Sequence, residues 1–134
     1  MRVFKTKKFA RFARKEGLDN EMLAEAVANI ERGLVDANLG SGLIKQRVAR
    51  AGAGKRGGFR TLIAYRIGEQ AIYLFGFAKN DLANISPEDE RDLKDYGALL
   101  LALKDKEIER MIKENELWEV PYGEEDKKIP QQDS

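Results

Sequence analysis

The stretch Leu43–Lys79, LIKQRVARAGAGKRGGFRTLIAYRIGEQAIYLFGFAK, decides the fold of this chain. It contains three runs rich in branched and aromatic residues, which are typical of strands, at residues 43–50, 59–66 and 70–78. The tight turn Ile67-Gly68-Glu69 joins the last two runs, so these strands pair antiparallel. Apolar and basic residues are interleaved along the runs, which predicts a small sheet with an apolar side and a cationic side.

The basic residues of this stretch are expected to gather at one end of the sheet. Alternation along the first strand puts Lys45 and Arg47 on the same face. Arg60 begins the second strand and Lys79 ends the third, and in a hairpin these positions lie at the same end. We therefore predict one cluster of these four cations. Five flanking residues could also contact a polyanion such as RNA: Arg50, Lys55, Arg56, Arg66 and Asn80.

The loop AGAGKRGG, residues 51–58, combines glycine with lysine, as do the phosphate-binding loops of nucleoside triphosphatases. That motif requires Ser or Thr directly after the lysine and a helix directly after the loop. Here Arg56 follows Lys55, and the next element is a strand. We exclude that motif and predict a flexible basic hairpin loop.

A first strand and two helices are predicted before this stretch. The strand covers residues 2–5, and Thr6 caps a helix over residues 7–15, which Gly17 ends. Asp19 caps the second helix, which closes near residue 33, and residues 38–42 are interpreted as a loop. The two helices form a hairpin that can pack on one face of the sheet.

The C-terminal part is predicted to be helical and then unstructured. Ser86 and Pro87 are a strong helix start, and a second short helix is expected over residues 106–115. Leu117, Trp118 and Val120 can dock on the body. The chain is polar from Pro121 onward, so we predict one domain over residues 1–120 and a disordered tail over residues 121–134.

Composition limits the possible functions. The chain has 134 residues, enough for one domain with a real core, and it contains no cysteine and no histidine. Disulfides and thiolate metal sites are excluded, and any catalysis must use Lys, Arg, Tyr, Asp, Glu, Ser or Thr. No apolar run approaches the roughly 20 residues that span a membrane. These features fit a cytoplasmic protein with no membrane association.

The net charge of +1 conceals a strong asymmetry along the chain. Residues 1–79 contain 16 Lys and Arg against 7 Asp and Glu, whereas residues 80–134 contain 8 against 16. This division suggests a polyanion-binding face together with an acidic segment that covers it or faces elsewhere. The alternative is that the C-terminal helices simply carry acidic residues on solvated surfaces.

A cationic cluster of this kind is suited to RNA chemistry. The 2′-hydroxyl of RNA is a nucleophile beside the scissile phosphate, and its attack needs a base, an acid and positive charge on the phosphorane, but no metal. A lysine whose pKa is lowered by neighbouring cations can take part in the proton transfers. Tyr65 or Tyr73 could assist if either faces the cluster.

The order of elements and motifs resembles the RelE/ParE superfamily of toxins from type II toxin–antitoxin modules. The resemblance covers residues 2–103 and is nearest to the HigB/RelE-like branch, through IERGLVDANLGSGLIKQRVAR, GGFRTLIAYR and FGFAKNDLANIS. Lys45 and Arg47 match paired basic positions of the family, Arg60 matches the arginine of a G-Y-R motif, and Lys79 matches the basic position that closes the last strand. Two positions differ, because Asn80 stands where RelE has arginine and no tyrosine occurs around Ser86.

The resemblance implies a compact α+β fold, with an N-terminal helical hairpin on a small, mainly antiparallel sheet and with C-terminal helices. It implies ribosome-dependent cleavage of mRNA without metal or cofactor, with Lys45, Arg47, Arg60 and Lys79 as catalytic residues. A cognate antitoxin, with a helix-turn-helix fold and encoded adjacently, is the implied protein partner. Two alternatives stay open: a non-catalytic ParE-like toxin that binds DNA gyrase, and a degenerate nucleic-acid-binding module.

Overall fold

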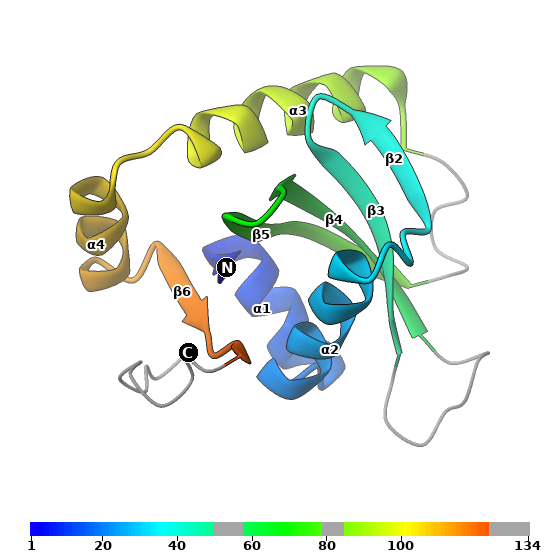
Figure 1. Cartoon of the computed structure of the whole chain (residues 1–134), viewed down its shortest axis with the longest axis horizontal. Coiled ribbons are helices and arrows are strands. Elements are labelled where there is room, and N and C mark those ends of the chain that lie inside the picture. The colour runs from blue at the N-terminus through cyan, green and yellow to red at the C-terminus, as the bar shows by residue number, and fades with distance from the viewer. Residues whose placement is uncertain (50–57, 79–84, 124–134) are drawn as a thin grey trace.

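The computed structural model describes residues 1–49, 58–78 and 85–123, which form one sheet with two helices on each face (Figure 1). In chain order the elements are β1 (Arg2–Thr6), α1 (Lys7–Glu16), α2 (Asn20–Glu31), β2 (Ala37–Gly40), β3 (Leu43–Ala49), β4 (Gly58–Arg66), β5 (Gln70–Ala78), α3 (Pro87–Leu101), α4 (Asp105–Lys113) and β6 (Leu117–Val120). The sheet order is β2-β3-β4-β5-β1-β6, and each neighbouring pair is antiparallel except β1 with β5. The predicted α+β fold is confirmed.

The helix ends have the causes that the sequence indicates. The Thr6 hydroxyl accepts a hydrogen bond from the Phe9 backbone N–H at 3.2 Å, and Gly17 ends α1 in the left-handed conformation with φ of 74°. The Asp19 carboxylate accepts from the Met22 N–H at 2.9 Å and so begins α2. These caps satisfy backbone groups that a helix end leaves unpaired. The predicted helical hairpin is therefore confirmed.

Two separate cores lie on the two faces of the sheet. The hairpin α1–α2 covers one face, where Phe9 and Leu23 pack with Ile63 and Tyr73 of the sheet. Helices α3 and α4 cover part of the other face, and their buried residues Leu100, Leu101 and Ile108 pack on Phe4, Leu62, Ile72 and Leu74. The prediction of one apolar and one cationic side is therefore wrong. Both faces carry a core, because helices cover both.

Two edge strands were not predicted. Residues 38–42 were interpreted as a loop, but Ala37–Gly40 is β2. It is held by Gln46 of β3, whose amide accepts from the Asp36 N–H at 3.0 Å and donates to the Leu34 carbonyl at 2.9 Å. At the other edge Leu117–Val120 forms β6 against β1. Such short strands depend on a tertiary partner, which propensity does not report.

The C-terminal helices largely agree with the sequence. Ser86 caps α3, since its hydroxyl accepts from the Asp89 N–H at 3.0 Å. Helix α4 begins one residue earlier and ends two residues earlier than predicted, because the backbone of Asn115 has a positive φ of 59°, outside the helical range. Within the predicted tail over residues 121–134, residues 121–123 are described, and Tyr122 packs on the core under α1–α2 and donates a hydrogen bond to the Glu31 carboxylate. The rest of the tail, from residue 124 onward, lies outside the described residues.

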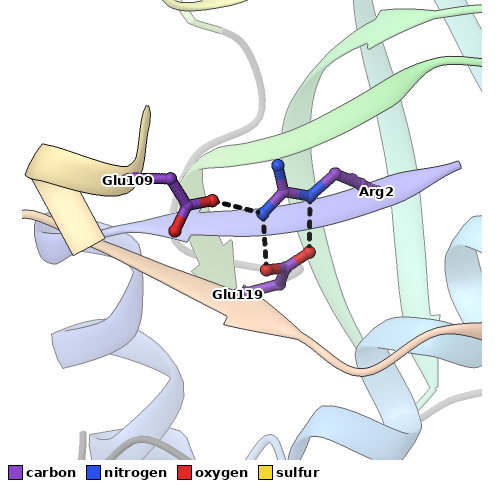
Figure 2. Close-up of polar contacts among 3 residues, drawn as sticks. All are labelled: Arg2, Glu109 and Glu119. Atoms are coloured by element: carbon purple, nitrogen blue, oxygen red, sulfur yellow. Dashed lines mark hydrogen bonds and ion pairs between the residues drawn. The ribbon is translucent and has the colours of Figure 1, made fainter. Parts of the chain in front are cut away.

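Arg2 fastens the C-terminal elements to the first strand (Figure 2). Its guanidinium binds both carboxylate oxygens of Glu119 on β6 at 2.8 Å and one oxygen of Glu109 on α4 at 3.1 Å. These hydrogen bonds, above all the one with Glu119, raise the pKa of Arg2 although burial opposes the charged form. Lys7 forms a further ion pair with Glu116 at 3.8 Å. Acidic residues of the C-terminal part therefore pair at the β1 side of the sheet.

Candidate functional site

Three of the predicted cations lie together on the face that α3 and α4 cover only in part. Arg47 of β3 is directly opposite Arg60 of β4, and Lys45 is opposite Leu62. Directly opposite residues in an antiparallel pair have Cβ atoms about 5 Å apart and point to the same face. Lys45 and Arg47 are two residues apart on one strand, roughly 7 Å. Lys45, Arg47 and Arg60 are named here the sheet cluster.

Arg60 is half-buried in this cluster, and one of its nitrogens lacks a partner. Its Nη1 atom is excluded from solvent and makes no hydrogen bond. Buried donors are nearly always satisfied, so an unmet donor calls for an explanation. The guanidinium group is a fork that matches the oxygens of a phosphate. A bound phosphodiester would supply the acceptor that Nη1 lacks.

The position of Arg47 depends on a glycine next to it in the sheet. A Cβ atom on Gly58 would lie 2.8 Å from Nε of Arg47 and 3.0 Å from the Val48 carbonyl oxygen. The side chain of Arg47 therefore passes over Gly58, toward the end of the β3–β4 pair. The Arg47 backbone N–H also donates to the Asp36 carboxylate at 2.6 Å, which ties this part of β3 to the segment before β2.

Two phenylalanines extend the sheet cluster across β5. Phe77 is directly opposite Arg60, and Phe75 is opposite Leu62. Strict alternation from Tyr73 would place both rings on the face that the helical hairpin α1–α2 covers, here called the hairpin face. A β-bulge instead inserts Leu74 as an extra residue, so the residues beyond it point to the opposite faces. The two phenylalanine rings thus lie on the same face as the cations, and the centroids of the two rings are 6.2 Å apart. Sequence reasoning missed them as site residues, because a bulge has no simple sequence signal.

The charges of Lys45 and Arg60 are not neutralised by carboxylates of the described residues. In the part of the chain that the structure describes, neither Lys45 nor Arg60 has a carboxylate oxygen within 4.0 Å. Among all the residues that the structure describes, no group of acidic side chains could hold a metal ion. The arrangement can therefore bind an anion by charge and hydrogen bonding.

Comparison with protein families shows to which family the chain belongs. The family model for the RelE toxin of the RelE/RelB toxin–antitoxin system matches residues 1–120. The chain belongs to the RelE family. It is thus a toxin of a toxin–antitoxin system, with an antitoxin as its partner. A search of curated proteins finds no significant match. None of the helices in the described ranges is long and apolar enough to cross a membrane.

The two tyrosines that could have assisted catalysis in this RelE-family chain do not face the cluster. Tyr73 is fully buried on the hairpin face, where its hydroxyl donates to the Leu23 carbonyl at 2.7 Å. Burial raises the pKa of Tyr73, which keeps the phenol protonated. Tyr65 packs on the same hairpin core. The condition under which either tyrosine could assist is therefore not met, because alternation along the strands turns both away from Arg60.

The other predicted residues fall into two groups. Arg66 lies at the far end of β4, six residues from Arg60 or roughly 20 Å along the strand. Its guanidinium donates to the Leu101 carbonyl at the end of α3, at 3.1 Å. It therefore does not join the sheet cluster. The remaining residues, Lys79, Asn80, Arg50, Lys55 and Arg56, lie outside the described residues.

Proposed function

We propose that this RelE-family toxin is a metal-independent, ribosome-dependent mRNA endonuclease that uses the RNA 2′-hydroxyl as its nucleophile. The single observation that carries the proposal is the opposed pair Arg47 and Arg60, with the buried, unpartnered Nη1 of Arg60. Like charges directly opposite each other in a sheet are destabilising, and an anion bound at the unpartnered Nη1 of Arg60 would relieve this repulsion. A phosphodiester has the required charge and geometry.

The reaction can be written with these residues in roles. The 2′-oxygen attacks phosphorus as its proton leaves to a base, and the bond from phosphorus to the 5′-oxygen breaks as that oxygen gains a proton. The products are a 2′,3′-cyclic phosphate and a 5′-hydroxyl. Arg47 and Arg60 stabilise the additional negative charge on the phosphorane. Lys45 is the described residue placed to transfer a proton, and Lys79 is the second candidate.

The test is expression of the toxin without its antitoxin, followed by mapping of the 5′ ends of ribosome-bound mRNA. The Arg60→Ala variant should lose the new mRNA ends and the growth arrest together. Arg110→Ala is a suitable control, because Arg110 is an exposed arginine of α4 away from the sheet cluster. Growth arrest without new mRNA ends would contradict the nuclease proposal and favour a ParE-like toxin that acts on gyrase.

A second candidate is supported by the orientation of the tyrosines. Since Tyr65 and Tyr73 both lie on the hairpin face, an aromatic acid or base is missing from the described part of the sheet cluster. This favours a degenerate module that binds RNA without cleaving it. Such a protein would bind RNA through Arg60 but cause neither new mRNA ends nor growth arrest. A small helix-turn-helix reading frame next to the toxin gene would support a HigB-type pair.

A further inference from the structure

Helix α1 carries a second group of cations, on the other side of Phe75 from the sheet cluster. Lys8, Arg11 and Lys15 are exposed and spaced three and four residues apart, so they form one ridge along the helix. We name them the α1 ridge. None of the three has a carboxylate oxygen within 4.0 Å in the described part of the chain, whereas the neighbouring Lys7 is paired with Glu116. The ridge is an unneutralised cationic surface.

Phe75 connects the two groups. On one side its β-sheet neighbours are Leu62 and then Lys45, across two strand spacings or roughly 10 Å. On the other side the Lys8 ammonium lies 5.0 Å from the centroid of the Phe75 ring, within reach of a cation–π interaction. A row of cation, aromatic ring and cation therefore crosses the sheet from β3 to α1.

The surface beside Phe75 is hollowed. One hollow of about 280 Å³ lies over Gly76 between Phe75 and the α1 ridge. A second, of about 550 Å³, continues past Lys8 and Arg11 toward Tyr96 of α3. Both hollows are lined by Lys8, Arg11 and Phe75. A flat aromatic group can thus lie against Phe75 with cations on its rim.

We propose that this row is a subsite for single-stranded RNA, in which a base stacks on Phe75 and the phosphates next to it are held by the α1 ridge. Cationic grooves with aromatic platforms are how proteins bind single strands without reading their sequence. A stacked base would displace the Lys8 ammonium from the ring toward a phosphate. The proposal rests on the nuclease function, because the strand would continue from the phosphodiester at the sheet cluster.

RNA fits this surface better than an acidic protein segment does. A protein helix would need a wide apolar surface, and the most exposed large apolar side chains of the described residues, Ile67, Leu99 and Leu34, do not line either hollow. The first hollow is lined by cations, phenylalanine rings and Gly76, whereas the second also contains apolar side chains such as Leu93 and Met111 and the carboxylate of Glu116. The lining that the two hollows share, Lys8, Arg11 and Phe75, supplies stacking and positive charge.

The test measures binding of a 12-nucleotide, fully 2′-O-methylated RNA to the full chain by fluorescence anisotropy, because this probe lacks the nucleophile and stays intact. The variant is Lys8→Ala/Arg11→Ala/Lys15→Ala, which keeps the helix since alanine is its best former. The matched control is Lys106→Ala/Arg110→Ala/Lys113→Ala on α4, which removes the same charge from exposed positions of another helix.

We expect the α1 variant to bind the 12-mer at least tenfold more weakly than the control does. The slope of log affinity against log salt should fall by about 2, since each phosphate contact contributes about 0.7 for single strands. A trinucleotide, which reaches only the sheet cluster, should bind both variants alike. Phe75→Leu should weaken 12-mer binding about fivefold to a hundredfold, the range for loss of one base–aromatic stack.

Equal 12-mer affinity of the α1 variant and the α4 control overturns the proposal, whether the wild type binds tightly or not at all. Loss of antitoxin binding with unchanged RNA binding overturns it in favour of a protein partner. The outcome is separable from the nuclease proposal. If Arg60→Ala abolishes cleavage while the α1 variant binds normally, only the subsite fails. If the wild type produces no new mRNA ends while the α1 variant loses binding, only the nuclease assignment fails.

Discussion

The two faces of the sheet differ in how they are covered, and this difference separates stability from function. On the hairpin face, α1 and α2 bury Phe9, Tyr73 and Ile63 almost completely. On the opposite face, α3 and α4 bury only part of the sheet and leave Arg47 and Arg60 half-buried, with Phe77 directly opposite Arg60. Polar groups that would be costly in a sealed core are thus found where a ligand can satisfy them. Substitutions on the two faces should therefore have opposite consequences.

The largest expected change in stability is on the hairpin face. Phe9→Ala should lower the free energy of unfolding by about 3–5 kcal/mol, because it removes a fully buried ring and leaves a cavity. The centroid of the Phe9 ring also lies 4.8 Å from that of the Tyr73 ring, and this aromatic contact is lost in the variant. Urea denaturation measures the change. Ile67→Ala is the control, since Ile67 is 84% exposed and its loss should cost less than about 0.5 kcal/mol.

On the opposite face, Arg60→Ala should lower cleavage strongly but stability little. Cleavage should fall by about 100- to 1,000-fold, as it does on removal of one donor that stabilises transition-state charge. Stability should stay within about 1 kcal/mol, because the buried Nη1 atom of Arg60 makes no hydrogen bond in the described structure. Single-turnover cleavage and urea denaturation of the same preparation give both values. A large loss of stability would mean that Arg60 is a core residue and not a ligand-binding one.

The sequence predicted those features of the sheet that follow from regular alternation along a strand. The ladder from Leu43 opposite Ala64 to Ala49 opposite Gly58 is unbroken, so alternation placed Lys45 and Arg47 correctly. The rings of Phe75 and Phe77 could not be placed, because a single extra residue reverses the faces of β5. Strand β6 was missed because its partner β1 lies at the other end of the chain, and β2 was missed because its sequence, ANLG, has little strand propensity. Whether Lys79 joins the cluster stays a prediction.

The β-bulge at Leu74 can be tested through Gly76, because the bulge turns Gly76 toward the hairpin face. A Cβ atom there would lie 2.4 Å from the Phe12 ring, closer than any real contact. Gly76→Ala should therefore cost about 1–3 kcal/mol through overpacking. The cost should shrink when Phe12→Leu is added, and a double-mutant cycle measures that coupling. An unchanged cost would mean that the strain lies in the backbone of β5 instead.

A smaller effect is expected at Gly58, where the new methyl group would push the Arg47 side chain aside. Gly58→Ala should lower cleavage by about tenfold, or about 1.4 kcal/mol, because a displaced guanidinium no longer meets the phosphorane. In an Arg47→Ala background the same change should have no further effect on cleavage. Additive losses in the double variant would show that Gly58 acts through something other than Arg47.

The smallest expected change in stability concerns Lys5, a cation on the hairpin face. Lys5 is 6% exposed, and its ammonium donates to the Asn20 side chain at 3.0 Å. Burial, assisted by the charge of Arg14, lowers the pKa of Lys5 from its ordinary value. A charged group in this position opposes folding, so Lys5→Met should raise the free energy of unfolding at pH 7 by about 1 kcal/mol.

The sign of the pH dependence follows from the direction of the shift. Between the lowered pKa of folded Lys5 and its ordinary value of 10.5, the unfolded chain binds more protons, so this residue makes stability rise with pH. The advantage of Lys5→Met should accordingly narrow as pH rises toward 10.5. Tyrosines such as Tyr73, whose pKa is raised, act in the opposite sense above pH 10 but do so equally in both proteins. The difference between the two stability curves therefore isolates Lys5, and a difference that stays constant from pH 7 to pH 10 would show that its charge costs nothing there.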